Sequence, residues 1–164
     1  FKYVKDNDID IKEYIEESAT MKGTIGDTLS SNDVKITLTD ALIYPRIEGE
    51  AFTDTPAEGK EYLVFFFNVE NIDDENNFVS IHNFTGYVDD TLVASKILIN
   101  NVDNVQYLSA DLTPGKKARG YVAYEVDTNW KQFDIHYKEN SFDYNDSMIF
   151  TVFNEENNQN NNNA

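Results

Sequence analysis

The chain has no cysteine, little proline or glycine, and few basic residues. Its 164 residues include no Cys, 3 Pro and 7 Gly. The missing cysteine excludes disulfide scaffolds, thiolate metal sites and cysteine nucleophiles. It leaves secretion open, since bacterial exported proteins often lack disulfides. No apolar run approaches the about 20 residues of a membrane-spanning helix.

The shortage of basic residues makes the chain strongly acidic. Against 13 Lys and Arg there are 30 Asp and Glu, so the formal net charge is -17. Such a surface repels phosphate backbones, and we expect no nucleic-acid binding. Attraction to an anionic membrane surface is disfavoured for the same reason. The acidity either recruits cations and basic partners or serves solubility alone, and solubility is the more common role.

What is present is a large apolar and aromatic fraction, typical of a β-sheet protein. The chain is 40% apolar and 13% aromatic, and its length fits one domain plus ends. The clearest strand spans 59–71, where side chains alternate between two faces. One face is uniformly apolar and contains Leu63, Phe65, Phe67 and Val69. The other begins apolar and ends polar: Tyr62, Val64, Phe66, Asn68 and Glu70. We therefore expect a central strand with one face buried and the other partly covered.

Further short strands with turns between them predict an all-β fold. They are expected at 34–45, 59–71, 78–81, 84–93, 97–99, 105–112, 118–126, 133–137 and 148–152. Pro45 ends the first of these, and Thr113-Pro114-Gly115 has the residue order of a type II turn. Without strand–helix alternation, the pattern favours an antiparallel β-sandwich of seven to nine strands, with a closed barrel as the main rival.

The two ends of the chain differ from this body. Residues 1–23 are expected to form a spacer with a short helix, because Ile11, Tyr14, Ile15 and Ser18 repeat at helical spacing. The sandwich is expected over residues 24–153. Residues 154–164 form an Asn-rich tail of low complexity, for which disorder is predicted.

Metal sites have only weak support in the sequence. Asp6, Asp8 and Asp10 resemble the start of a calcium loop, but Ile11 stands where the loop needs glycine. The acidic turns at 73–75 and 89–90 are better explained as solvated turns. We predict no cofactor and at most weak calcium binding.

Catalytic motifs are also scarce, so we expect no enzyme. His82 and His136 are the only histidines, and nothing in the sequence places them together. There is no Gly-x-Ser-x-Gly elbow and no glycine-rich phosphate loop. Carboxylates are numerous enough for a glycosidase pair, which keeps a carbohydrate-processing alternative open.

The candidate binding residues lie in one long loop and at the only tryptophan. The polar loop from Arg46 to Pro56 is either a binding loop or a flexible connection, and it contains Glu48 and Asp54. Trp130 lies where a turn enters a strand. It either anchors a partner or a sugar ring, or it caps the core, and we favour the core because a large ring is usually mostly buried.

Three stretches together resemble a known family. They are residues 59–71, residues 84–90, and residues 112–126 with 133–137. The first stretch has Gly-Lys before a hydrophobic strand that ends in Asn. The third has a Pro-Gly turn before a strand that contains Gly-Tyr-Val. In this order they resemble the uncharacterised immunoglobulin-like domain of Gram-positive secreted lipoproteins, which is related in fold to a secreted mycobacterial immunoprotective antigen. The resemblance covers about residues 24–153. Its motifs are structural, so it assigns no catalytic residue.

This resemblance implies an exported immunoglobulin-like β-sandwich of the bacterial cell surface. A lipid anchor upstream of residue 1 is expected, and the Asn-rich tail is compatible with an AT-rich Firmicute genome. We expect a non-enzymatic binding or accessory domain whose partner is an envelope or surface protein. The alternative is a calcium-dependent carbohydrate- or peptidoglycan-processing protein of the cell envelope.

Overall fold

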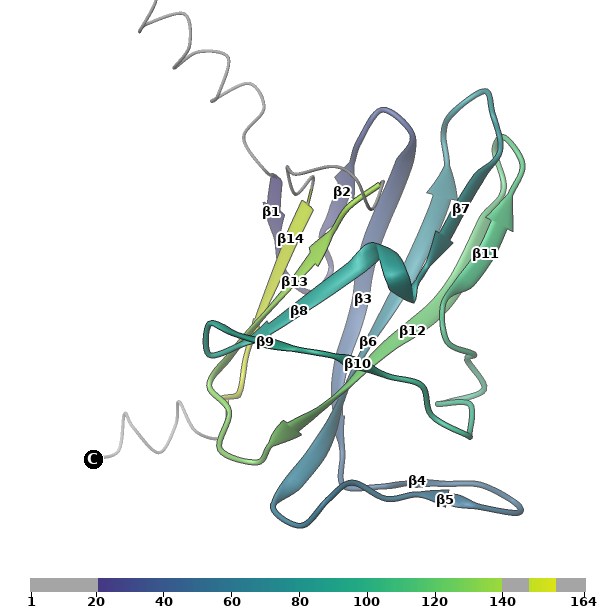
Figure 1. The fold of residues 1–164 in the computed structure, drawn as a ribbon. Helices are drawn as coiled ribbons and strands as arrows, with labels where there is room; N and C mark the ends of the chain where they lie inside the picture. Colours follow the sequence, from purple (N-terminus) through teal and green to yellow (C-terminus); the bar gives the residue numbers. More distant parts are fainter. Residues whose placement is uncertain (1–20, 140–147, 156–164) are drawn as a thin grey trace, which may run out of the picture.

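Two five-stranded β-sheets face each other in the computed structural model, which describes residues 21–139 and 148–155 (Figure 1). The first sheet contains, in order, β1 (Met21–Gly23), β14 (Met148–Phe153), β13 (Gln132–Tyr137), β8 (Phe84–Val88) and β9 (Thr91–Val93). The second contains β10 (Ser95–Lys96), β12 (Lys117–Asp127), β6 (Lys60–Asn71), β3 (Val34–Tyr44) and β2 (Thr28–Ser30). Two small sheets pair β4 (Ile47–Glu48) with β5 (Thr53–Asp54) and β7 (Asn77–Ser80) with β11 (Ser109–Leu112). The predicted all-β sandwich is confirmed.

The strand pairs of the described residues are antiparallel with one exception. β1 pairs with β14 in parallel, with Met21 opposite Met148. The first described strand thus lies at the sheet edge beside the last one. Its three residues are too few to show an alternating pattern in the sequence.

The core between the sheets is built on the predicted inward face of β6. Phe65 and Phe67 are fully buried in the main hydrophobic cluster. The Phe65 ring lies 5.1 Å from the ring of Phe133 on β13, and the Phe67 ring lies 5.6 Å from that of Phe150 on β14. Both side chains therefore join one sheet to the other, which confirms the predicted orientation of this strand.

The outer face of β6 is covered over its first half only. Tyr62, Val64 and Phe66 are buried in a second hydrophobic cluster, together with Tyr121 and Ala123 of β12. The side chains that cover them come from the β4–β5 segment and from the loop after β10, namely Ile47, Leu98 and Val102. Beyond Phe66 the cover ends, and Asn68 is exposed. This matches the expectation of a partly covered second face.

The end of β6 is fixed by a buried asparagine. The Asn71 side-chain nitrogen donates to the carbonyl oxygens of Glu75 and Leu112, both at 2.8 Å. Its oxygen accepts from the Asp73 backbone N–H at 3.0 Å and from the Asn77 side chain at 2.8 Å. All the hydrogen-bonding groups of this amide are satisfied. The Asn71 side chain thereby holds the acidic turn after β6 in place.

Two turns have the geometry that their residues suggest. Lys116 N–H donates to the Thr113 carbonyl at 3.1 Å, and Gly115 has a φ of 81°, as the third position of a type II turn requires. Asp89 and Asp90 both have positive φ, 46° and 67°, in the hairpin between β8 and β9. Asp tolerates this left-handed conformation better than most residues, which explains a hairpin without glycine.

The differences from the predicted elements concern short strands and the chain ends. The sheets contain more strands than the seven to nine expected, because β1, β2 and β10 have only two or three residues. Residues 97–99 form a loop rather than a strand, and the predicted loop 46–56 contains a hairpin. The β1 strand begins at Met21, inside the predicted spacer 1–23. The predicted N-terminal helix and most of the tail lie outside the described residues.

Within the described residues, no helix has the length and apolar character needed to span a membrane.

Candidate functional site

The β4–β5 hairpin contains three of the four predicted binding residues and extends from the lower end of the second sheet in Figure 1. Arg46 Nε donates to Glu48 Oε1 at 2.9 Å. The two side chains are 61% and 69% exposed, so this ion pair adds little stability. Both remain available to a partner at the surface.

Asp54, the third predicted residue, is buried and connects the hairpin to the loop after β10. Its carboxylate accepts the backbone N–H groups of Ile99 and Asn100, each at 2.9 Å. It also accepts the Asn100 side-chain amide at 2.9 Å. A buried carboxylate with three N–H donors is a structural acceptor.

Asn100 completes this connection from the other side. Its side-chain nitrogen donates to the Phe52 carbonyl at 2.9 Å, in addition to Asp54. Gly49 packs so closely here that a Cβ atom would collide with the Asn100 amide and lie 2.8 Å from the Phe52 carbonyl oxygen. The Tyr121 hydroxyl on β12 donates to the Asn100 carbonyl at 3.3 Å. The hairpin is thus held against the sheet, and the predicted loop is not a loose connection.

This network presents exposed apolar side chains. Phe52 is 64% exposed, Ile97 58% and Ile99 72%, whereas Leu98 between the two isoleucines is buried. The backbone of Phe52 is bonded to Asn100, and the backbone of Ile99 is bonded to Asp54. We call the exposed residues of this region the hairpin platform: Glu48, Glu50, Phe52, Ile97 and Ile99.

Trp130, the fourth predicted residue, is not part of this platform. It lies in the turn between β12 and β13, where its backbone N–H donates to the Asp127 carbonyl at 3.1 Å. Its side chain is only 2% exposed and belongs to the main hydrophobic cluster. Of the two roles considered for Trp130, the structure shows the core role.

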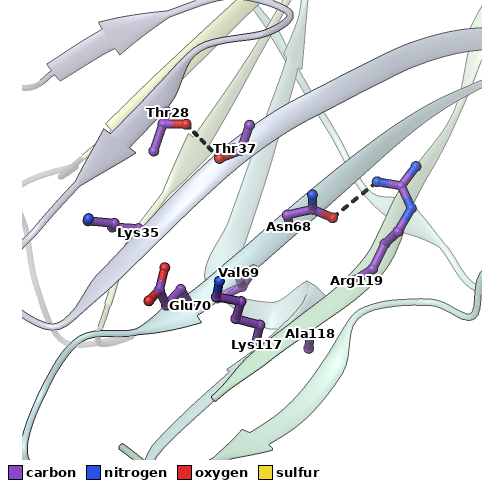
Figure 2. A pocket seen from close by; sticks show the side chains of 9 residues that line it. All are labelled: Thr28, Lys35, Thr37, Asn68, Val69, Glu70, Lys117, Ala118 and Arg119. Atoms are coloured by element: carbon purple, nitrogen blue, oxygen red, sulfur yellow. Dashed lines mark hydrogen bonds between the residues drawn. The ribbon is translucent and has the colours of Figure 1, made fainter. Parts of the chain in front are cut away.

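A second candidate surface is an open groove on the outer face of the second sheet, at the end of β6 that the cover leaves free (Figure 2). Its volume is about 590 Å³. We call it the cationic groove, and it is lined by Thr28, Lys35, Thr37, Asn68, Val69, Glu70, Lys117, Ala118 and Arg119. Strands β2, β3, β6 and β12 all contribute to it.

Arg119 is the most firmly held cation of the groove. Its Nη1 donates to Thr39 Oγ1 at 2.8 Å and to Asn68 Oδ1 at 3.1 Å, the latter drawn in Figure 2. Its Nη2 lies 3.8 Å from Asp40 Oδ2, and the guanidinium carbon lies 5.4 Å from the centre of the Phe66 ring. The cation is fixed in place over the aromatic ring.

Lys35 and Lys117 lie on either side of Glu70. Register places Lys35 of β3 and Lys117 of β12 both directly opposite Glu70 of β6. No ion pair within 4.0 Å joins either lysine to Glu70 among the described residues. Three cations and one carboxylate therefore give the groove lining a net positive charge in a chain of net charge -17.

A smaller groove of about 430 Å³ lies on the outer face of the first sheet. Its Asp134 carboxylate accepts from Thr151 Oγ1 at 2.6 Å and from the Gln132 amide at 3.2 Å. The His136 ring packs 4.8 Å from the ring of Tyr87. Because Asp134 is already engaged by its neighbours, this groove has the bonding of an ordinary polar sheet face.

The ionisable groups with clearly shifted pKa values include several tyrosines, among them the buried Tyr121 and the half-buried Tyr44. Burial raises the pKa of Tyr121 to about 12. Burial, helped by the hydrogen bond that Tyr44 donates to Asp103 at 2.8 Å, raises the pKa of Tyr44 to about 12. These two residues support the cover over β6, so their shifts reflect packing.

The acidic turns use their carboxylates within the fold. Asp89 Oδ1 accepts the backbone N–H of Gln132 at 2.9 Å, and Asp73 Oδ1 accepts that of Asp74 at 2.8 Å. The pKa of Asp73 is lowered, first by a side-chain hydrogen bond with Asp74 and to a lesser extent by this backbone bond. Within residues 21–139 and 148–155, no three His, Cys, Asp or Glu side chains are grouped to hold a metal ion. The calcium-like residues 6–17 lie outside the described residues.

The sequence identified the hairpin residues but missed the cationic groove. Lys35, Lys117 and Arg119 are far apart in the chain and meet only because β3 and β12 flank β6. In the sequence, the only indication that they share a surface is that each lies on the polar face of a strand with alternating side chains. Phe52, Ile97 and Ile99 were also missed as exposed residues, because isolated apolar residues normally predict burial.

Solved structures of bacterial proteins share this fold. The chain aligns with YcdA, a predicted lipoprotein of Bacillus subtilis, with a TM-score of 0.62 and 17% identity over 78% of this chain and 38% of that one. It thus spans well under half of YcdA. A predicted lipoprotein of Staphylococcus aureus aligns with a TM-score of 0.56 and 16% identity, covering 79% and 90% of the two chains. The secreted protein MPT63 of Mycobacterium tuberculosis aligns with a TM-score of 0.54 and 13% identity, covering 82% and 98%. At these identities the likeness is one of fold.

The family is shown by the sequence itself. A comparison with curated proteins finds no match. The model of one domain family, by contrast, matches residues 23–157, which include nearly all the described strands. The chain therefore belongs to the family described as "Domain of unknown function (DUF4352)".

Proposed function

We propose that this chain is a non-enzymatic, extracytoplasmic binding domain with an immunoglobulin-like sandwich, carried by a lipid-anchored or secreted protein of the bacterial cell surface. Two findings support it. The fold is shared with predicted lipoproteins and a secreted protein, and this supports an extracytoplasmic location. The hairpin platform exposes apolar side chains on a hydrogen-bonded support, which bears on binding.

The observation that carries the binding role is the exposure of Phe52, Ile97 and Ile99 on one hydrogen-bonded unit. Single exposed apolar residues are common, but a group of them on one support is typical of an interaction site. The Asp54–Asn100 hydrogen bonds fix the backbone that bears them. A partner therefore loses little free energy in ordering this surface when it binds.

The charges around the platform indicate the chemistry of the partner. Glu48 and Glu50 are exposed on the hairpin, and Asp103 is exposed in the loop beside it. Arg46 and Glu48 offset each other in their ion pair, so the net negative charge here comes from Glu50 and Asp103. A complementary partner is a surface or envelope protein that presents an apolar segment flanked by Lys or Arg. Nucleic acid does not fit the platform, since the same carboxylates would repel its backbone.

A non-enzymatic role fits the bonding of the platform. Asp54, its buried carboxylate, accepts N–H groups with both oxygens. No nucleophile is among these donors, so Asp54 holds backbone in place rather than moving a proton. The exposed groups above it are mainly apolar, and they suit contact with another protein more than general acid–base chemistry.

The proposed location is tested with the natural full-length protein carrying a C-terminal epitope tag. We expect the tag in the envelope fraction or the culture medium, and we expect protease added to intact cells to remove it. A tag that stays in the cytosol and resists external protease would contradict the extracytoplasmic assignment.

The binding surface is tested by site-specific photocrosslinking in living cells. A photoreactive amino acid replaces Phe52 in one variant and Ile99 in another. Phe78 on β7, which is 59% exposed and outside the platform, is the matched control. We expect the same discrete adduct from positions 52 and 99 and none from 78. An adduct of equal yield from all three positions, or none from 52 and 99, would contradict the platform.

A further inference from the structure

The cationic groove is a surface separate from the hairpin platform, although both lie on the second sheet. The cover of β6 rests on Tyr62, Val64 and Phe66. The groove begins at Asn68 and continues to Glu70. A ligand in the groove would therefore leave the platform free.

Hydrogen-bond donors predominate in the groove. Lys35 and Lys117 are exposed, and neither forms an ion pair with another of the described residues. Asn68 uses its oxygen to accept from Arg119, so its amide N–H groups can donate outward. Thr28 and Thr37 share one hydrogen bond of 2.7 Å, in which only one of the two hydroxyls donates. The other hydroxyl hydrogen is free to reach a ligand.

Acceptors, by contrast, are few. Among the described residues that line the groove, Glu70 is the only carboxylate, and the Asn68 oxygen already accepts one hydrogen bond from Arg119. A polypeptide laid across this face would bring backbone N–H groups that need acceptors, and only Glu70, the threonine hydroxyls and the remaining lone pair of the Asn68 oxygen could accept them. A polymer whose polar atoms are acceptors only has no such difficulty.

The arrangement of the charges favours a ligand with repeated anionic groups. Lys35 and Lys117 lie on strands on either side of β6, so their Cα atoms are separated by two strand spacings, about 10 Å. Arg119 lies two residues further along β12, about 7 Å from Lys117. Successive phosphates of a chain can meet these cations one after another. The groove is also open, as the passage of a chain requires.

We propose that the cationic groove binds a phosphate-bearing polymer, with Lys35 and Lys117 contacting its oxygens and Asn68 and a threonine hydroxyl donating to them. Arg119 positions the Asn68 amide. The strong negative charge of the rest of the chain opposes approach from a distance. Attraction acts only within about 8 Å at physiological salt, so binding depends on contact in the groove.

The test uses inorganic polyphosphate as the probe and the purified chain, with affinity measured at roughly 0.15 M and at roughly 0.05 M salt. We expect binding that strengthens at the lower salt concentration. The variant Lys35→Ala/Lys117→Ala should lose at least about tenfold in affinity. The control Lys96→Ala/Lys131→Ala removes two exposed lysines outside the groove and should change affinity by less than about twofold.

A gain-of-affinity variant separates this proposal from a loss of folding. Glu70→Gln removes the one carboxylate of the groove, and we expect it to bind polyphosphate about threefold or more tightly than the natural chain. No binding of polyphosphate, equal losses in the two double-lysine variants, or weaker binding by Glu70→Gln would overturn the proposal. Equal or tighter binding of poly-glutamate would overturn the choice of phosphate in favour of an acidic polypeptide.

Discussion

Tyr124 places a polar hydroxyl group inside the main hydrophobic cluster. Its ring packs 4.6 Å from that of Phe133, and its hydroxyl is buried without a hydrogen-bond partner among the described residues. Leaving such a group unsatisfied costs about 1–3 kcal/mol. We expect Tyr124→Phe to leave the free energy of unfolding unchanged or to raise it by up to about 1 kcal/mol. Denaturant unfolding measures this change.

Tyr121→Phe is the matched control on the same strand. Its hydroxyl donates to the Asn100 carbonyl at 3.3 Å. Removing this hydroxyl should lower the free energy of unfolding by about 0.5–1.5 kcal/mol. A Tyr124→Phe variant more destabilised than Tyr121→Phe would contradict the assignment of an unsatisfied Tyr124 hydroxyl.

Phe65 is the residue on which packing between the sheets depends most directly. It is fully buried and contacts the rings of Phe67, Tyr124 and Phe133. We expect Phe65→Ala to cost about 3–5 kcal/mol, a large part of the about 5–15 kcal/mol that stabilises a domain. Phe78→Ala, at a 59% exposed position, should cost no more than about 0.5 kcal/mol. A loss below about 1 kcal/mol for Phe65→Ala would mean that β6 faces the other way.

At the scale of elements, the β4–β5 hairpin depends on one buried carboxylate. In Asp54→Ala, the backbone N–H groups of Ile99 and Asn100 lose their acceptor, at a cost of about 1–3 kcal/mol. We expect the hairpin to detach before the sandwich unfolds. Hydrogen exchange at these two amides should therefore accelerate strongly, while exchange in β6 and β12 changes little.

Glu48→Ala is the control for Asp54→Ala within the same hairpin. The Glu48 side chain is 69% exposed and, among the described residues, bonds to Arg46 alone, so its removal should leave exchange at Ile99 and Asn100 unchanged. Unchanged exchange in Asp54→Ala as well would contradict the role given to the buried carboxylate.

The elements that could be predicted are those whose two faces differ. The sequence predicts β6 together with the burial of each of its faces, because Phe65 and Phe66 point to opposite faces of a twelve-residue strand. It does not predict the β4–β5 hairpin, because strands of two polar or mixed residues have no alternation to detect. Its stability comes from Asn100, which is 46 residues away from Asp54 in the chain.

The candidate sites were predicted only in part, for the same physical reason. Arg46, Glu48 and Asp54 are close in sequence, so their loop could be identified, although the burial of Asp54 could not. The cationic groove depends on β3, β6 and β12 being neighbours. Strand order follows from packing of the whole chain and is not visible in local patterns.

At the scale of the whole molecule, buried and half-buried tyrosines set an alkaline limit to stability. Burial is the first cause that raises the pKa of each of these tyrosines above its ordinary value of 10.0: Tyr44, Tyr62, Tyr121, Tyr124 and Tyr137. A raised folded-state pKa means that the unfolded chain releases these protons first. The stability they maintain is present below pH about 10 and is lost as the pH rises towards about 12.

We therefore expect the free energy of unfolding to fall steeply above pH about 10. The part of the ultraviolet tyrosinate signal that comes from these five tyrosines should appear together with loss of sheet structure. Tyr44→Phe removes one of these protons and should make the fall less steep. Constant stability up to pH about 12, or full tyrosine ionisation in a chain that stays folded, would contradict this account.

The central claim is that the Asp54–Asn100 hydrogen bonds organise the hairpin platform for a partner. Photocrosslinking from position 52 in living cells, compared between the natural chain and Asp54→Ala, tests it most directly. We predict a discrete adduct with the natural chain and its loss in Asp54→Ala, with the sandwich still folded. An adduct of the same size and yield in both chains would contradict the claim.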